Sequence, residues 1–113
     1  MIKVSQRQNG GVTILDVMGK ITIGAGDLAV RNAVQEALNA GATGLLVNLQ
    51  GVSTIDSSGI GELVSAFTTA ANRGVKLKLL HLPPKVNDVL QITHLITVFD
   101  VFENEDEAVK SFS

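Results

Sequence analysis

Residues 45–49, Leu-Leu-Val-Asn-Leu, followed at residues 55–61 by Ile-Asp-Ser-Ser-Gly-Ile-Gly, decide the fold. The first segment is a short, mostly apolar run, which predicts a buried strand. A helix is predicted from Ser57 or Ser58 to about Asn72, because apolar residues recur there at helical spacing: Ile60, Leu63, Val64, Phe67 and Ala71. We expect residues 50–55 to form the turn between strand and helix. A buried strand that leads into an amphipathic helix is typical of an α/β fold.

Two strands are predicted before this segment, over residues 2–8 and 12–18. Asn9-Gly10-Gly11 joins them, and Asn-Gly favours a hairpin because both turn residues must tolerate positive φ. In the second strand the side chains that point to either face of the sheet are apolar, so we expect both faces of this strand to be covered. A flexible loop from Gly19 to Gly26 then leads to a helix over residues 28–39, capped by Asp27. The apolar stripe of that helix contains Val30, Ala33, Val34, Ala37 and Leu38.

The remaining elements are predicted after Gly74, which ends the second helix. Strands are expected over residues 75–82 and 98–102, with a short helix from Pro84 between them. Asn104 caps a last helix, with Glu107 as its capping-box partner. Strands that alternate with helices imply parallel crossovers. We therefore predict one α/β domain over residues 1–113, with a mixed sheet, an antiparallel N-terminal hairpin and about four helices.

Composition excludes several classes of function. The chain has 113 residues, a formal net charge of −2, two histidines and no cysteine, which excludes disulfide scaffolds, zinc ribbons and iron–sulfur proteins. We expect no metal and no cofactor. The Lys and Arg residues are scattered and no aromatic residue lies among them, so direct nucleic-acid binding is not expected.

No apolar segment approaches the roughly 20 residues that span a bilayer, and the N-terminus lacks the pattern of a signal peptide. We therefore expect no membrane insertion and a cytoplasmic protein.

The segment Asp56-Ser57-Ser58 is the main candidate site. It lies between a buried strand and a helix, at the edge where open α/β sheets bind ligands. Helix capping needs only one such residue, whereas this segment has three. We expect Gly59 and Gly61 to leave space for a partner's approach. A phosphate on Ser57 would gain from the helix N-terminus, repel Asp56 and oppose docking of a partner.

Two other patterns suggest different chemistry. Gly24-x-Gly26-x-x-Ala29 matches a dinucleotide fingerprint, but Asn48 and Gln50 stand where its acidic residue belongs, so a flexible loop is favoured. Ser57, His81 and Asp56 suggest a small serine hydrolase, yet the nucleophile elbow is missing because Ile55 occupies its first glycine position. His94 has no recognisable partner, and we expect it to be structural.

Around residues 56–61 the chain resembles a STAS domain, specifically the bacterial anti-sigma factor antagonists. The resemblance covers essentially the whole chain and includes residues 47–49, Gly74, residues 82–86 and residues 98–102. It implies a non-enzymatic regulator of transcription that switches partners, with Ser57 as the phosphoacceptor and Ser58 as the neighbour to exclude. The implied partners are an anti-sigma factor that is itself a serine kinase and a metal-dependent serine phosphatase. The unphosphorylated protein would bind the kinase and free its sigma factor, and phosphorylation would end that binding.

One segment departs from the family pattern. Residues 19–22 are Gly-Lys-Ile-Thr where family members often have Gly-Glu-Leu-Asp, so Lys20 and Thr22 replace two acids on a loop near the partner. We expect Thr22, Gly24 and Ile60 to contact the partner. The departure leaves open a role as the STAS subunit of another signalling complex or of a lipid- or anion-transport complex.

Overall fold

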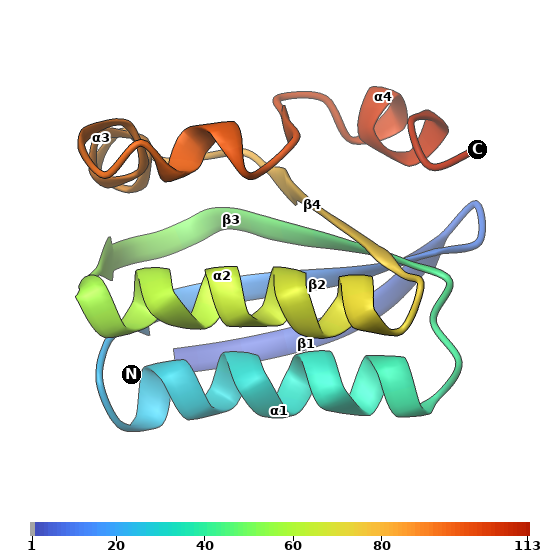
Figure 1. Cartoon of the computed structure of the whole chain (residues 1–113), viewed down its shortest axis with the longest axis horizontal. Helices are drawn as coiled ribbons and strands as arrows, with labels where there is room; N and C mark the ends of the chain where they lie inside the picture. Colours follow the sequence, from blue (N-terminus) through green and yellow to red (C-terminus); the bar gives the residue numbers. More distant parts are fainter. Residues whose placement is uncertain (1) are drawn as a thin grey trace.

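A computed structural model describes residues 2–113, which fold into five strands and four helices (Figure 1). Both the predicted α/β class and the N-terminal hairpin are confirmed. The elements in chain order are β1 (Ile2–Asn9), β2 (Val12–Ile21), α1 (Ala25–Asn39), β3 (Gly44–Ile55), α2 (Ser57–Asn72), β4 (Lys76–Leu80), α3 (Pro84–Ile92), the 3₁₀ turn η1 (Leu95–Thr97), β5 (Val101–Phe102) and α4 (Glu105–Lys110).

The sheet has the strand order β1-β2-β3-β4-β5. β1 runs antiparallel to β2, and the other neighbouring pairs are parallel. The hairpin turn is at Gly10 and Gly11, with φ of 58° and 83°, as the Asn-Gly-Gly sequence predicts. Because β2, β3 and β4 are parallel, the helix that follows each strand begins at the same edge of the sheet.

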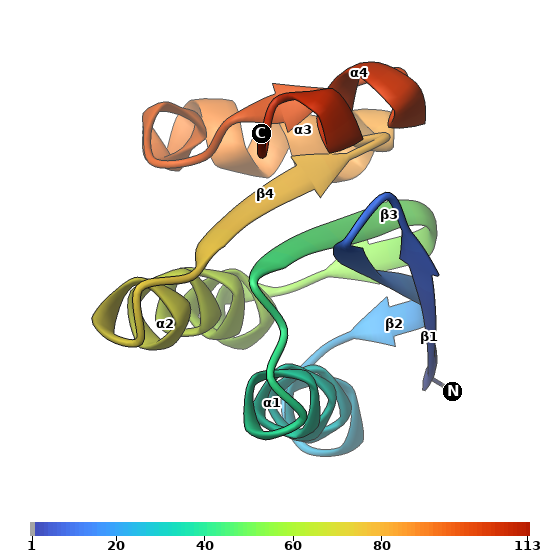
Figure 2. The same ribbon diagram turned by 90° about the vertical axis from the view of Figure 1, so that its right-hand side faces the viewer.

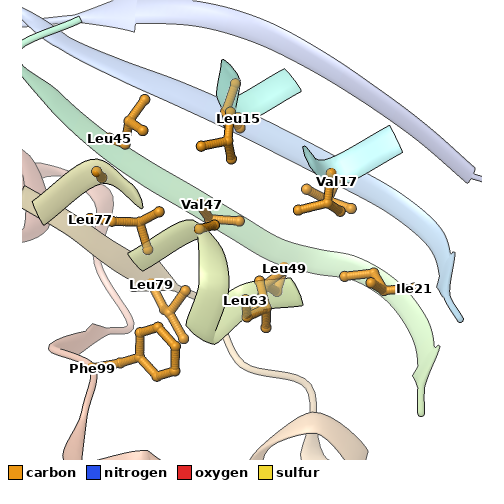
Figure 3. Close-up of a cluster of buried hydrophobic side chains, with 14 of the residues drawn as sticks. Leu15, Val17, Ile21, Leu45, Val47, Leu49, Leu63, Leu77, Leu79 and Phe99 are labelled. Atoms are coloured by element: carbon orange, nitrogen blue, oxygen red, sulfur yellow. The ribbon is translucent and has the colours of Figure 1, made fainter. Parts of the chain in front are cut away.

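Two apolar clusters hold the sheet between its helices. α1 and α2 lie side by side against one face, as both ribbon views show (Figures 1 and 2). Alternate residues of the strands pack beneath them, including Leu15, Val17, Leu45, Val47 and Leu49 (Figure 3). The intervening side chains point to the other face, where Ile14 and Leu46 pack against Ala108 of α4. Each buried side chain of this size contributes about 1.5–3 kcal/mol to folding.

β2 is covered on both faces over only part of its length. Residues from Val12 to Leu15 are buried, in agreement with the predicted central strand. Met18, farther along, is 53% exposed. The cluster beneath α4 contains Val12 and Ile14 but not Met18, so α4 covers only the first half of this face. The predicted two-sided burial is therefore wrong for the second half of β2.

β2 and β3 are both longer than predicted. Residues 50–55 were expected to form a turn, but β3 continues through them because β2 continues beside it. The added pairs include Gly19 with Val52 and Ile21 with Ile55, and a register shift lies between them. Gly19 and Lys20 are therefore in a strand, and the expected loop is reduced to Thr22–Gly24, which we call the docking loop. Val52 and Ile55 are buried, so packing stabilises a segment whose composition is turn-like.

α1 begins three residues earlier than predicted. Its N-cap is Gly24, with φ of 94° and no side-chain cap, so Asp27 lies in the first turn and is not the cap. Gly26, in the added turn, packs closely on β2, because a Cβ atom there would lie 2.4 Å from the carbonyl oxygen of Lys20. The predicted apolar stripe is confirmed, because Val30, Val34, Ala37 and Leu38 are buried.

The C-terminal strands are shorter than predicted. β4 covers Lys76–Leu80, and β5 is only Val101–Phe102. The chain before β5 leaves the sheet because Phe99 is buried against Phe67, with ring centroids 5.6 Å apart in an edge-on arrangement. α3 begins at Pro84 as predicted, and Asn104 caps α4 by accepting a hydrogen bond from the Glu107 N–H at 3.0 Å.

A cluster of charged side chains fastens α4 to the hairpin. Arg7 contacts Asp16 at 2.7 Å and Glu105 at 2.6 Å. Glu105 also accepts a hydrogen bond from Asn9 at 2.8 Å, and Asn48 donates to Asp16 at 2.8 Å. The hydrogen bonds from Arg7 and Asn9 lower the pKa of Glu105 to about 2. We call these five residues the Arg7 cluster.

None of the helices within residues 2–113 combines the length and the apolar character that a membrane crossing needs. Over the same residues, no group of three or more His, Asp or Glu side chains is arranged to hold a metal ion.

Candidate functional site

The predicted site lies where β2 and β3 end and α1 and α2 begin, at the left of Figure 1. It consists of the docking loop and the switch turn, which we define as Asp56, Ser57 and Ser58. The Asp56 N–H donates to the Ile21 carbonyl oxygen at 3.3 Å, so the end of β3 is joined to the end of β2. The long pairing of these two strands therefore brings together two segments that are more than 30 residues apart.

Asp56 holds the two segments in place. One carboxylate oxygen accepts a hydrogen bond from the Gly59 N–H at 2.9 Å and thereby caps α2. The other accepts from the Ile23 N–H in the docking loop at 3.0 Å. The bonds from Gly59 and Ile23 lower the pKa of Asp56, so the side chain is a carboxylate at neutral pH. A single acid thus caps the helix and positions the docking loop.

Ser57 and Ser58 are free of this capping role. Ser57 is exposed and Ser58 is half-buried, and both lie in the first turn of α2. Neither hydroxyl hydrogen-bonds to any side chain or backbone group within residues 2–113. The excess of capping residues noted in the sequence is therefore real: Asp56 caps α2, and two hydroxyl groups remain available.

The two glycines of the site differ in role. Gly59 is buried, and a Cβ atom there would lie 2.1 Å from the Ile21 carbonyl oxygen. Gly59 therefore permits close packing of α2 on β2, in place of the expected open approach. Gly61 is exposed, and a Cβ atom there would meet nothing within 4 Å. Gly26 packs against β2 as Gly59 does, so the glycines of the dinucleotide-like pattern also have a structural explanation.

The expected partner-binding residues are only partly exposed. Ile60 is 4% exposed and belongs to the core, so it is not available for direct contact with a partner. Thr22 is half-buried and Gly24 is exposed. The apolar surface at this site comes instead from Ile23, which is 75% exposed, and from Leu28, which is 47% exposed. Neither was named among the expected contact residues, although Ile23 lies in the predicted loop from Gly19 to Gly26 and Leu28 lies outside the apolar stripe of α1.

The structure does not assemble the alternative catalytic triad. β4 pairs with β3 only as far as Leu80 opposite Asn48. β3 then continues to Ile55, which carries Ser57 roughly 20 Å farther along the strand direction than His81, at about 3.3 Å per residue. The His81 side chain lies 4.0 Å from the Glu103 carboxylate. His94 is exposed and occupies the left-handed region, with φ of 61°, at the start of η1.

Known proteins resemble this chain in sequence. The family model described as STAS domain matches residues 3–108. The Anti-sigma F factor antagonist of Paenibacillus polymyxa is 21% identical over 109 residues, which cover 96% of this chain and 92% of that protein.

Solved structures share the fold over nearly the whole chain. The Thermotoga maritima protein TM1081 superposes with a TM-score of 0.87 at 24% identity, covering 96% of this chain and 93% of that one. The Bacillus cell fate determinant SpoIIAA in its phosphorylated form superposes with a TM-score of 0.73 at 19% identity, covering 98% and 100%. At these identities the likeness establishes the fold.

Proposed function

The chain belongs to the STAS domain family, as the sequence around Ser57 predicted, and on this premise we propose that it is an anti-sigma factor antagonist switched by phosphorylation of Ser57. The observation that carries the proposal is an exposed, unbonded hydroxyl on the first residue of α2, beside a carboxylate that is held in place by two backbone N–H groups. The names of the relatives support the same role.

Accessibility favours Ser57 over Ser58 as the phosphoacceptor. A kinase must bring the γ-phosphate of ATP up to the hydroxyl, which is simpler at an exposed side chain than at a half-buried one. The new phosphate also lies at the start of a helix of 16 residues, where backbone N–H groups and the helix dipole favour an anion. The folded protein therefore tolerates the modification.

The effect of the phosphate is electrostatic. It adds about −1.5 to −2 charges at neutral pH beside Asp56, which is already ionised. Two neighbouring anions strongly favour hydration of this surface, and hydration opposes burial beneath a partner. Phosphorylation of Ser57 thus weakens docking without unfolding the turn.

The surface next to Ser57 suits a partner with an apolar contact region. Ile23 and Leu28 are the exposed apolar side chains of this region, and the N–H of Ile23 is bonded to Asp56. The docking loop is therefore positioned before a partner arrives, which reduces the entropy lost on binding. Lys20, Thr22 and Gly24 flank this surface, and the exposed Lys20 gives it a positive charge, opposite to the acid of the family pattern that the chain resembles.

The proposed partners follow from this role. One is an anti-sigma factor with serine kinase activity, which binds the unphosphorylated protein and releases its sigma factor. The other is a serine phosphatase that removes the phosphate. The protein itself acts as substrate and ligand, not as an enzyme, and the role places it in the cytoplasm with the transcription machinery.

The phosphoacceptor can be identified directly. The purified protein is incubated with ATP and the anti-sigma factor kinase from its own genome, and phosphate is located by mass spectrometry in wild type, Ser57→Ala and Ser58→Ala. We expect incorporation in wild type and Ser58→Ala and none in Ser57→Ala. Equal incorporation in both variants would refute the site, and the absence of a kinase that modifies the wild type would favour the alternative STAS roles.

A further inference from the structure

A groove lies at the opposite end of α2 from Ser57. It has a volume of about 460 Å³ and lies between the carboxyl-terminal half of α2, β4 and the segment before β5. Its walls are mainly apolar and include Phe67, Ala71, Leu77 and Val98, which define what we call the β4 groove. At about 1.5 Å per residue, Ala71 is roughly 20 Å along the helix from Ser57, so the groove is separate from the switch turn.

The β4 groove follows an open edge of the sheet. β5 pairs with β4 only at Leu79 and Leu80. The N–H groups of Leu79 and His81 donate to carbonyl oxygens of the β5 segment at 2.9 Å. Backbone groups alternate between the two sides of a strand, so the N–H and C=O of Leu77 point toward this same edge. Within residues 2–113 no backbone partner for them is found on that side.

Because Leu77 is buried, its backbone N–H and C=O groups, unpaired within residues 2–113, indicate that a binding partner is missing. Leu77 is only 2% exposed, and buried N–H and C=O groups in proteins are nearly always hydrogen-bonded. β5 cannot supply the partners, because Phe99 turns away from the strand direction to pack against Phe67. A ligand that both donates and accepts at backbone spacing would satisfy them.

The charges around the groove define the ligand further. Lys76 lines the groove, is exposed, and makes no ion pair with any acid in residues 2–113. Lys78 is buried and hydrogen-bonded to Ser111. Its Nζ lies 3.8 Å from the Asp100 carboxylate, so the charges of these two side chains offset each other. The free positive charge is therefore at Lys76, beside the apolar walls.

We propose that the β4 groove binds an extended segment of a partner protein, which adds a short strand beside Lys76–Lys78. The segment hydrogen-bonds to the N–H and C=O of Leu77, inserts an apolar side chain between Phe67 and Val98, and places an acidic side chain near Lys76. Recognition of this kind takes affinity from main-chain hydrogen bonds and specificity from side-chain pockets. The protein thus holds a second partner whose binding does not depend on the state of Ser57.

The first test concerns the free protein. Amide hydrogen exchange, followed by NMR, compares Leu77 with Leu79, which is also buried but is hydrogen-bonded to the β5 segment. We expect Leu77 to exchange much faster than Leu79. Equal protection of the two amides would overturn the open edge and, with it, the proposal.

The second test concerns the ligand. Random peptides displayed on phage are selected against the full chain, and the enriched peptides are then measured against Ala71→Glu, which places a negative charge in the groove. Asn72→Glu is the matched control, because Asn72 is exposed on the same helix and does not line the groove. Circular dichroism verifies that both variants fold.

We expect the selected peptides to pair an apolar residue with Asp or Glu and to slow the exchange of the Leu77 amide. They should bind Ala71→Glu about tenfold more weakly than the wild type, a difference of roughly 1.4 kcal/mol. Asn72→Glu should bind them as the wild type does. A selection in which no peptide distinguishes Ala71→Glu from Asn72→Glu would overturn the proposal. So would a concentration-dependent dimer abolished by Ala71→Glu, because the occupant would then be a second copy of the chain.

Discussion

Asp56 and Glu105 lie at the starts of two helices and use their carboxylates in opposite ways. Asp56 accepts hydrogen bonds from the backbone N–H groups of Gly59 and Ile23. Glu105 accepts from the side chains of Arg7 and Asn9. In the Arg7 cluster each charged side chain forms an ion pair with another side chain, and these pairs stabilise the fold. In the switch turn the backbone satisfies the acid, and the neighbouring serine hydroxyls remain available.

The largest expected effect concerns the backbone packing beneath the switch turn. In Gly59→Ala the new methyl group would lie 2.1 Å from the Ile21 carbonyl oxygen, so α2 must shift away from β2. We expect the free energy of unfolding, measured in urea, to fall by about 2–3 kcal/mol. Unfolding of Gly59→Ala at the same urea concentration as the wild type would contradict the close packing of α2 on β2.

Gly61→Ala is the matched control, two residues along the same helix. A Cβ atom at Gly61 meets nothing within 4 Å, and alanine is the better helix former. We expect a gain of roughly 0.5–1 kcal/mol in the free energy of unfolding. A lower free energy of unfolding in both variants would mean that any side chain in the first turns of α2 destabilises the fold, whatever its contacts.

The next effect concerns the cap itself. Asp56→Ala removes the bond to Gly59 and the bond to Ile23, so we expect the free energy of unfolding to fall and the Ile23 amide to exchange faster. Asp27→Ala is the control, because Asp27 lies in the first turn of α1 and makes no side-chain cap bond. We expect a change of only a few tenths of a kcal/mol there. Unchanged exchange at Ile23 in Asp56→Ala would show that the docking loop is ordered by other contacts.

The smallest expected effect on the free energy of unfolding comes from the Arg7 cluster, and it depends on pH. The pKa of Glu105 is about 2 in the folded protein, against 4.5 for the ordinary side chain. The unfolded chain therefore binds more protons between these values, and stability rises with pH across that window. The contribution of Glu105 is fully present above pH 4.5 and is lost as pH falls toward about 2. Allowing for screening by solvent around Arg7, which is 42% exposed, we expect it to be about 1 kcal/mol.

Urea unfolding of the wild type and Glu105→Gln across pH 2–7 measures this contribution. The difference in stability between the two proteins should be largest near neutral pH and should shrink as the solution is acidified. A difference that stays constant with pH would show that the carboxylate charge of Glu105 does not stabilise the fold.

The sequence predicted those features that depend on local chemistry. Asn9-Gly10-Gly11 predicted the hairpin, the apolar spacing predicted α2, and Asn104 predicted the cap of α4; the structure confirms all three. The extension of β3 through residues 50–55 could not be found in the same way. Its composition is turn-like, and it becomes a strand only because β2 lies beside it.

The candidate site, like the fold, was predicted only in part from the sequence. The excess of capping residues correctly indicated that not all three residues cap α2, but it did not indicate that Asp56 is the cap. Ile60 was misplaced at the surface although it belongs to the apolar stripe of its own helix, and that stripe is the face that packs on the sheet. Ile23 was correctly expected in a loop, but the shortness of that loop follows from the pairing of β2 with β3 and was not visible in the sequence.

Binding of the proposed anti-sigma factor partner to the unmodified protein and to the protein phosphorylated at Ser57 tests the proposed switch most directly. Both forms are titrated with the same partner by calorimetry, and urea unfolding verifies that the phosphate leaves the fold intact. An electrostatic switch at Ser57 predicts that the phosphorylated form binds at least about tenfold more weakly, which corresponds to roughly 1.4 kcal/mol. Equal affinities for two equally stable forms would contradict it.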